Sequence, residues 1–356
     1  MFTTFYFRTL YIFFVIISLN IFLFSTSNLK ADAFLVEEIE VSEKLENNFN
    51  KDLLINKGFK KAFSELLSSL VKSSDLKKIK NIKLNEIKGM IESFSIKEER
   101  FVEKTYQLNL GVTFNKKKIY NFLENNNIFP SQIVKETFLF LPVIINQKNG
   151  ELLVFSNNPI YEKWKIVKNK SFLIEYLLPT EDLEDLQTIK EKSLIIENYD
   201  FKKIIEKYFL KHSIVALIFK DNDEIKVLSK ITIKDKKIIK NNSFKNFDFN
   251  NEKMLENLMN ELKIIYEDLW KEYNQINTSI KLQLLIQVDN KNLDTSIKFE
   301  KDLNEVDLIS SYSINKIDKD FIFYEVTFNG TPNNFINIMK NKDYKFDTKK
   351  KIWILK

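Results

Sequence analysis

The first 33 residues constrain the chain most strongly, because they determine the compartment in which the remainder folds. Arg8 and the free amino terminus make a weakly positive start, and an apolar run from Tyr11 to Phe24 follows. After a polar gap come Ala31 and Ala33, spaced as the small residues of a signal peptidase site. The pattern predicts a secretory signal peptide over residues 1–33 and a periplasmic mature protein.

The length of the apolar run leaves an alternative open. The run covers 14 positions and is interrupted by Ser18 and Asn20, whereas a membrane-spanning helix needs about 20 apolar residues. The segment from Phe5 to Phe24 nearly reaches that length if Arg8 extends to the headgroups. In that case the leader is an uncleaved anchor, and the protein stays in the inner membrane and faces the periplasm. A buried core helix fits less well, since the run has no polar face.

Composition limits the chemistry that the mature part can perform. No cysteine is present, so an exported chain of 323 residues has to be stabilised by its apolar core rather than by disulfides. A single histidine, His212, excludes a multi-histidine metal site, and the five glycines lie too far apart for a phosphate-binding loop. The net charge of +6 is spread over interspersed lysines and acids, which argues against nucleic acid as a partner. No cofactor is expected, and the oligomeric state is left open.

Apolar periodicity divides the mature part into three modules and places the protein in the α+β class. Residues 34–129 are predicted to form a small β-α-α-β-α module, and residues 130–278 an α/β layered domain. Residues 279–356 follow the order β-α-β-β-α-β of the ferredoxin-like motif, which hosts many unrelated functions.

Individual segments carry more specific predictions. In the first module we expect a second helix from Leu84 to Phe94 and a single strand from Phe101 to Phe114. The continuous apolar run 137–145 indicates a central strand that is buried on both faces. Asn158-Pro159 is typical of a helix start, and the chain is predicted to end in one strand from Lys345 to Leu355.

Several short segments occur in an order that is known from other proteins. They are the leader, the helix Lys61–Leu67, the strand and helix that end at Leu123, Asn158-Pro159 with Trp164, and the run Leu178–Asp185. In this order they resemble, from Phe34 to Ile276, a family of exported bacterial proteins catalogued as domain of unknown function 2066. The family's proline with two spaced acids corresponds to Pro179, Asp182 and Asp185. The resemblance implies a location in the cell envelope. It implies no activity, because none is established for the family.

Four residues are candidate contacts with a ligand or partner: Asn158, Trp164, Asp182 and Asp185. The two aspartates have the chemistry for acid–base catalysis or for binding a divalent cation. Alternatively, they stabilise the start of a short helix that Thr180 is predicted to cap. Trp164 is either a stacking platform for a ligand or a core residue that packs on a sheet.

Two other features have competing interpretations. The lysines of 234–245 and 349–351 either bind an anionic lipid or polysaccharide or form a solvated surface. His212 is predicted at a helix end, where a cation is favoured, rather than in a catalytic site.

These observations favour a non-enzymatic protein that binds or assembles with other envelope proteins through sheet edges or grooves. Two alternatives stay open: an envelope hydrolase that uses Asp182 and Asp185, and a membrane-anchored assembly factor that keeps its leader. A membrane contact is expected only through an uncleaved leader.

Overall fold

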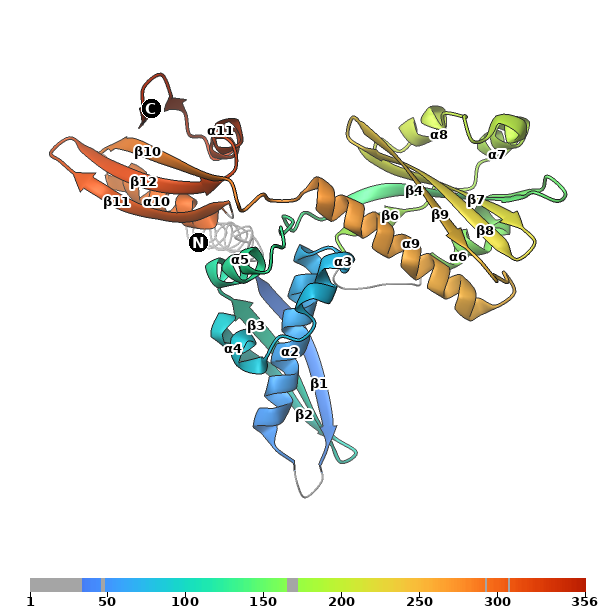
Figure 1. Ribbon diagram of the computed structural model, residues 1–356, viewed down its shortest axis with the longest axis horizontal. Coiled ribbons are helices and arrows are strands. Elements are labelled where there is room, and N and C mark those ends of the chain that lie inside the picture. Colours follow the sequence, from blue (N-terminus) through green and yellow to red (C-terminus); the bar gives the residue numbers. More distant parts are fainter. Residues whose placement is uncertain (1–33, 46–48, 165–171, 292, 307) are drawn as a thin grey trace, which may run out of the picture.

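The computed structural model describes residues 34–356 except 46–48, 165–171, 292 and 307. The described chain is a mixed α/β protein with three separate sheets (Figure 1). We call the corresponding parts the first unit (β1 to α5), the middle unit (β4 to α9) and the last unit (β10 to β14). The predicted signal peptide with Ala31 and Ala33 lies outside the described residues. Within them, no helix combines the length and the apolar character needed to span a membrane.

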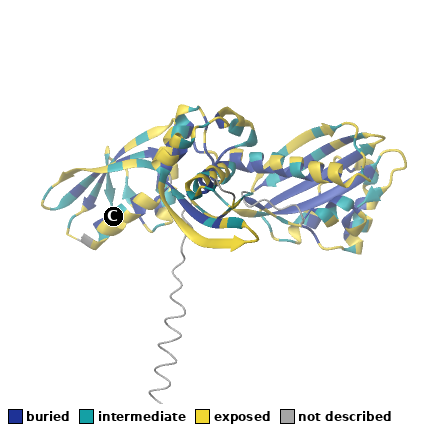
Figure 2. Cartoon of the chain, turned by 90° about the horizontal axis from the view of Figure 1, so that it is seen from below, coloured by how far each residue is buried: buried dark blue, intermediate teal, exposed yellow. Residues whose placement is uncertain are grey.

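The first unit is a three-stranded antiparallel sheet, in the order β1-β3-β2, that packs against the long helix α2. Its elements are β1 (Leu35–Lys44), α2 (Lys51–Leu70), α3 (Ser73–Leu76), the 3₁₀ helix η1 (Lys77–Ile79), α4 (Leu84–Met90), β2 (Ile91–Val102), β3 (Thr105–Phe114) and α5 (Lys116–Asn125). Apolar side chains of α2 and β3 form the core, while nearly all of the outer strand β2 is exposed (Figure 2).

The first unit has one strand more than the predicted β-α-α-β-α order. Helix α4 ends at Met90 instead of Phe94, and the chain continues directly into β2. It then turns through Glu103 and Lys104, both at positive φ, into β3. The helical spacing from Ile87 to Phe94 was therefore misleading, because Phe94 also alternates with serines at the period of two that a strand requires.

The middle unit has a six-stranded sheet with helices on both faces. Its elements are β4 (Glu136–Asn146), β5 (Leu152–Leu153), η2 (Phe155–Asn157), α6 (Pro159–Lys163), β6 (Ile174–Leu177), α7 (Leu183–Glu191), η3 (Ser193–Ile195), α8 (Lys202–Glu206), β7 (His212–Asp221), β8 (Glu224–Ile233), β9 (Lys236–Phe244) and α9 (Glu252–Tyr273). The strand order is β5-β4-β7-β8-β9, and β6 also pairs with β4. Helices α6 and α9 cover one face, and α7 and α8 cover the other (Figure 1).

Strand β4 confirms the burial predicted from its apolar run. Phe138 and Phe140 point into the core shared with α9, whereas Leu141 and Val143 point into the core beneath α7 and α8. A strand that is buried on both faces has no polar side to present, which explains why its sequence does not alternate.

The last unit has a five-stranded sheet in the order β11-β12-β10-β14-β13. Its elements are β10 (Lys281–Asp289), α10 (Leu293–Glu305), β11 (Ile309–Ile317), β12 (Phe321–Asn329), α11 (Pro332–Lys340), β13 (Phe346–Asp347) and β14 (Ile352–Leu355). The single last strand predicted for 345–355 is thus two short antiparallel strands, and β14 runs parallel to β10. Asp347 accepts a hydrogen bond from the N–H of Lys349 at 3.1 Å, which favours the turn between them.

Helix α9 connects the middle unit to the first unit. The Nζ of Lys271 donates to the carbonyl oxygen of Ser68 at 2.5 Å, and the carboxylate of Asp268 accepts from the N–H of Ser73 at 2.8 Å. One continuous apolar cluster contains core residues of both the first and the last unit. The described units are therefore packed together rather than joined only by the chain.

Candidate functional site

Asn158 and Trp164, two of the predicted contact residues, are buried in the middle unit. The Oδ1 of Asn158 accepts from the N–H of Ile160 at 2.9 Å and so caps α6, as the Asn-Pro pair predicted. Its amide donates to the carbonyl oxygen of Pro142 at 3.0 Å. The Trp164 ring stacks on Phe140 with 3.9 Å between centroids. These contacts hold α6 against the sheet, and neither side chain presents a surface to a partner.

The other two candidates, Asp182 and Asp185, lie together at the start of α7. Asp182, rather than the predicted Thr180, caps this helix, because its Oδ1 accepts from the N–H of Glu184 at 2.8 Å. The Nζ of Lys207, at the end of α8, lies 3.1 Å from Asp182 and 2.7 Å from the buried Asp185. One lysine thus bridges both carboxylates and fastens α7 to α8.

The hydrogen bond from Lys207 lowers the pKa of Asp182 below its ordinary value, and the two carboxylates raise the pKa of Lys207. A general acid has to be protonated at working pH, and a general base needs a free lone pair near its substrate. The lowered pKa keeps Asp182 ionised at neutral pH, so it is not a general acid there and is a weakened general base. The local chemistry is that of an ion-paired structural contact.

His212 is the first residue of β7 instead of lying at the predicted helix end. Its ring stacks on Phe138 at 4.7 Å and contacts Trp270 edge-on at 5.2 Å. Burial lowers the pKa of His212, because the protein interior disfavours its charged form. The residue is therefore a neutral member of the aromatic core at neutral pH.

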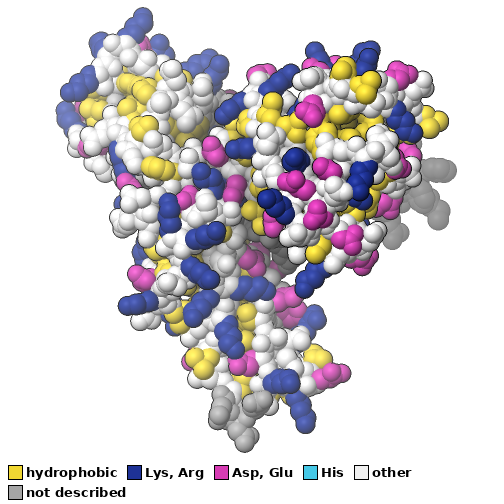
Figure 3. All heavy atoms as spheres, turned by 45° about the vertical axis from the view of Figure 1, so that its right-hand side comes forward, with side chains coloured by type: hydrophobic (Ala, Val, Ile, Leu, Met, Phe, Trp, Pro, Cys, Tyr) yellow, Lys and Arg dark blue, Asp and Glu magenta, His cyan; other side chains and the backbone are white. Residues whose placement is uncertain are grey.

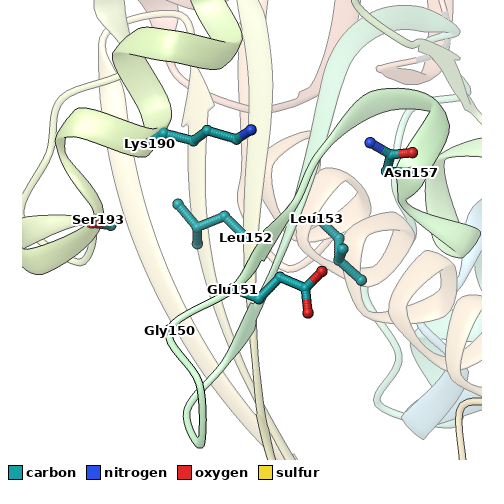
Figure 4. Close-up of a pocket in the computed structure, with 7 residues that line it drawn as sticks. All are labelled: Gly150, Glu151, Leu152, Leu153, Asn157, Lys190 and Ser193. Atoms are coloured by element: carbon teal, nitrogen blue, oxygen red, sulfur yellow. The ribbon is translucent and has the colours of Figure 1, made fainter.

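A depression of about 580 Å³ lies between β5, η2 and the helical layer of the middle unit. Its polar groups come from Glu151, Asn157, Lys190 and Ser193. Lys190 reaches from α7 toward the space above β5, and Asn157 faces the same space (Figure 4). Because most of its lining is exposed, the depression is a shallow surface feature rather than an enclosed reaction chamber.

Large apolar side chains are exposed on the same helical layer. Leu194 on η3 is 98% exposed and Phe209, just after α8, is 94% exposed. Leu183 and Ile195 are exposed as well. We call these four residues the α7–α8 face. Figure 3 shows hydrophobic side chains on the surface of the middle unit. Larger exposed apolar patches mark interaction sites for proteins, membranes or ligands.

Neither the placement of possible metal ligands nor the comparison with known proteins assigns a function to the chain. In the part of the chain that the structure describes, no cluster of three or more His, Asp and Glu residues is placed to hold a metal ion. No protein-family model and no curated protein matches the chain.

Proposed function

We propose that this protein works in the bacterial cell envelope as a non-enzymatic binding or assembly protein, and that the α7–α8 face is its contact surface. The exposure of Leu194 and Phe209 carries this proposal. Each of these side chains would gain roughly 1.5–3 kcal/mol on full burial, so a partner that covers both gains substantially from the contact. Exposed apolar patches that are rimmed by polar residues mark interaction sites.

Export is part of the same proposal and rests on the sequence. The leader with Ala31 and Ala33 supports a periplasmic location, and a retained leader would instead anchor the protein in the inner membrane. Intact mass of protein isolated from the envelope distinguishes the two, since a mature chain that begins at Phe34 excludes the anchor.

The finer architecture is also proposed. We assign the last unit to the ferredoxin-like type, with the hairpin β13–β14 in place of a single last strand. The order of segments from Phe34 to Ile276 supports membership of the exported family described above.

The hydrolase alternative depends on Asp182 and Asp185. It gains no support from their contacts, because both carboxylates are paired with Lys207. The proposal of a binding protein does not need these residues for chemistry, only for the attachment of α7 to α8.

Co-purification from envelope extracts tests the proposal with a matched pair of variants. Leu194→Asp changes an exposed apolar residue on the α7–α8 face, and Ile264→Asp changes one on α9, on the opposite side of the sheet. The proposal predicts that a defined envelope protein stays with the wild type and with Ile264→Asp but is lost from Leu194→Asp. Equal recovery of that protein with both variants would overturn the assigned face.

A further inference from the structure

The outer strands of the three sheets differ in how they are protected from pairing with another strand. In the described part of the chain, β1, β2 and β11 each contain extra residues that bulge out of register with the inner neighbour. Strands β5 and β13 have only two residues each, and β6 has four. Bulges and short length are two usual ways in which proteins keep sheet edges from pairing with other chains.

Strand β9 is the described outer strand that has neither protection. All nine of its residues, Lys236–Phe244, pair one to one with residues of β8, and the register has no bulge. In such a strand, alternate residues direct both the N–H and the C=O away from the neighbour. Among the described residues, no other segment donates to or accepts from the free side of β9. The strand therefore presents a regular row of backbone donors and acceptors.

The charged side chains of β9 all have the same sign. The strand carries Lys236, Lys237 and Lys240 and no acidic residue. Lys237 lies 3.8 Å from the exposed Asp200, and it is the one lysine of the three that has an ion-pair partner among the described residues. Like charges on opposing positions destabilise a pair of strands, whereas opposite charges stabilise it. The edge therefore disfavours pairing with β9 of a second copy and favours a strand with acidic side chains.

Pairing with β8 shows on which face of the sheet the side chains of β9 lie. Lys240 is opposite Ser229, whose hydroxyl oxygen lies 2.8 Å from that of Tyr266 on α9. Lys240 is therefore on the α9 side, and Lys236 is on the same side because it lies four residues earlier in a regular strand. Ile239 is on the opposite side and is 64% exposed. An added strand would meet two lysines on one face and an exposed apolar side chain on the other.

We propose that β9 is a docking edge for an extended acidic segment of a partner polypeptide, which joins the middle sheet as a further strand. Backbone hydrogen bonds along the edge supply affinity, and the side chains select the segment. Its acidic residues alternate with apolar ones, so that the acids face Lys236 and Lys240 while the apolar residues face Ile239. The docking edge shares no residue with the α7–α8 face, and the inference goes beyond the function proposed above without depending on that face.

Titration of the full mature chain with blocked heptapeptides, followed by amide NMR of the labelled protein, tests this assignment. The acidic probe is Thr-Glu-Ile-Glu-Val-Glu-Thr, and the basic probe has lysine in place of each glutamate. A third probe, Thr-Glu-Ile-Glu-Pro-Glu-Thr, keeps the acidic charge but cannot complete a backbone ladder, because proline lacks the N–H. Only the first probe is expected to give saturable shifts that are confined to β9 and its neighbour β8, and to slow hydrogen exchange along β9.

Charge reversal tests the selection by charge. The double variant Lys236→Glu/Lys240→Glu should weaken binding of the acidic peptide about tenfold, because two attractive cross-strand pairs become repulsive, and it should bind the basic peptide instead. The double variant Lys349→Glu/Lys351→Glu makes the same change in net charge on exposed residues of the last unit and should bind the acidic peptide as the wild type does. Leu194→Asp should also leave this binding unchanged, which separates the docking edge from the α7–α8 face.

Three results would overturn the docking edge: equal binding of the basic or the proline-containing peptide, equal effects of the two double variants, or a lack of saturable shifts. A dimer of the free protein in which hydrogen exchange slows along β9 would also overturn it, because a second copy would then occupy the strand. So would binding of phosphatidylglycerol vesicles, but not of the acidic peptide, that Lys236→Glu/Lys240→Glu abolishes. That result would assign the lysines to a membrane contact.

Discussion

The Nζ of Lys263 lies 4.7 Å from the centroid of the Trp164 ring and donates to the carbonyl oxygen of the same residue at 2.7 Å. A lysine of α9 thereby fixes the end of α6 from within the core. One turn further, the carboxylate of Glu267 accepts from the N–H groups of Leu173 and Ile174 at 3.0 and 2.7 Å. Helix α9 therefore combines an apolar face with buried charged groups that satisfy backbone atoms of other segments.

Lys263 should make the stability of the protein depend on pH. Burial lowers the pKa of its amine from 10.5 to about 8. Between these values the unfolded chain binds more protons than the folded one, so the free energy of unfolding rises with pH in this window. From about pH 7 to about pH 9.5 the expected gain is about 2 kcal/mol.

Urea unfolding of the wild type, Lys263→Met and Lys253→Met at both pH values measures this gain. Lys253 is an exposed lysine of the same helix, and its replacement should keep the rise. Lys263→Met should lose it. Identical pH slopes in all three proteins would show that Lys263 has an ordinary pKa in the folded state.

Lys207→Met should destabilise the protein by about 1–3 kcal/mol, because the buried carboxylate of Asp185 loses its donor. Asp185→Asn in the same background should recover part of the loss, since a neutral amide does not need a cation. Denaturant unfolding of the two single variants and the double variant gives the coupling energy. Strictly additive effects would contradict the bridge between α7 and α8.

Asp182→Asn should lower the stability of the protein, and it should not abolish a hydrolase activity. Because the pKa of Asp182 is lowered in the folded state, its ion pair stabilises the protein above the ordinary carboxyl pKa and is lost as pH falls through the lowered value. Acid unfolding should therefore begin at higher pH in the variant. A hydrolase screen in which the wild type turns over a substrate and Asp182→Asn does not would establish the enzymatic alternative.

Phe209→Gly should stabilise the isolated protein while weakening its contact with the partner. Phe209 has a φ of 52°, a left-handed conformation that disfavours side chains with a Cβ, and its ring is exposed. Relief of this strain stabilises the folded state more than the added flexibility stabilises the unfolded chain. The free energy of unfolding should therefore rise by about 0.5–1 kcal/mol. Thermal unfolding measures the effect against Phe101→Gly, an exposed phenylalanine of strand β2 that should be destabilising. A loss of stability in Phe209→Gly would contradict the strain.

Two helical glycines should respond oppositely to alanine. A Cβ on Gly58 would lie 2.3 Å from the Cδ1 of the buried Leu110, whereas a Cβ on Gly89 would meet no atom within 4 Å. Gly58→Ala should therefore destabilise the first unit by about 1–3 kcal/mol through overpacking. Gly89→Ala should stabilise it by roughly 0.5–1 kcal/mol through helix propensity. Urea unfolding of both variants decides, and a stabilising Gly58→Ala would show that α2 can move away from β3.

Local sequence patterns predicted the elements whose cause is local. The apolar run of β4 and the Asn158-Pro159 start of α6 follow from burial and capping, and the structure confirms both. The predicted helix end at Phe94 was wrong. The apolar residues from Ile87 to Phe94 fit helical spacing, but the last of them also alternate with polar residues as in a strand. Pairing with β3 decides between helix and strand for the residues after Met90, and this pairing is a long-range contact.

The candidate site was only partly visible from sequence for the same reason. Leu194 and Ile196 are two residues apart and chemically similar, yet one is exposed and the other is buried beneath η3. The pairing of Asp185 with Lys207 joins residues 22 positions apart, and no periodicity reports it. Exposure of an apolar residue is a property of the assembled layers, so only the fold could reveal the α7–α8 face.

Site-specific photo-crosslinking in intact cells tests the central claim most directly. A photoreactive amino acid at position 194 should form an adduct with a discrete envelope protein, and Phe209→Ser in the same chain should abolish it. The same amino acid at position 264 should give no such adduct. Equal adducts from both positions, or adducts only with cytosolic proteins, would contradict an envelope contact through the α7–α8 face.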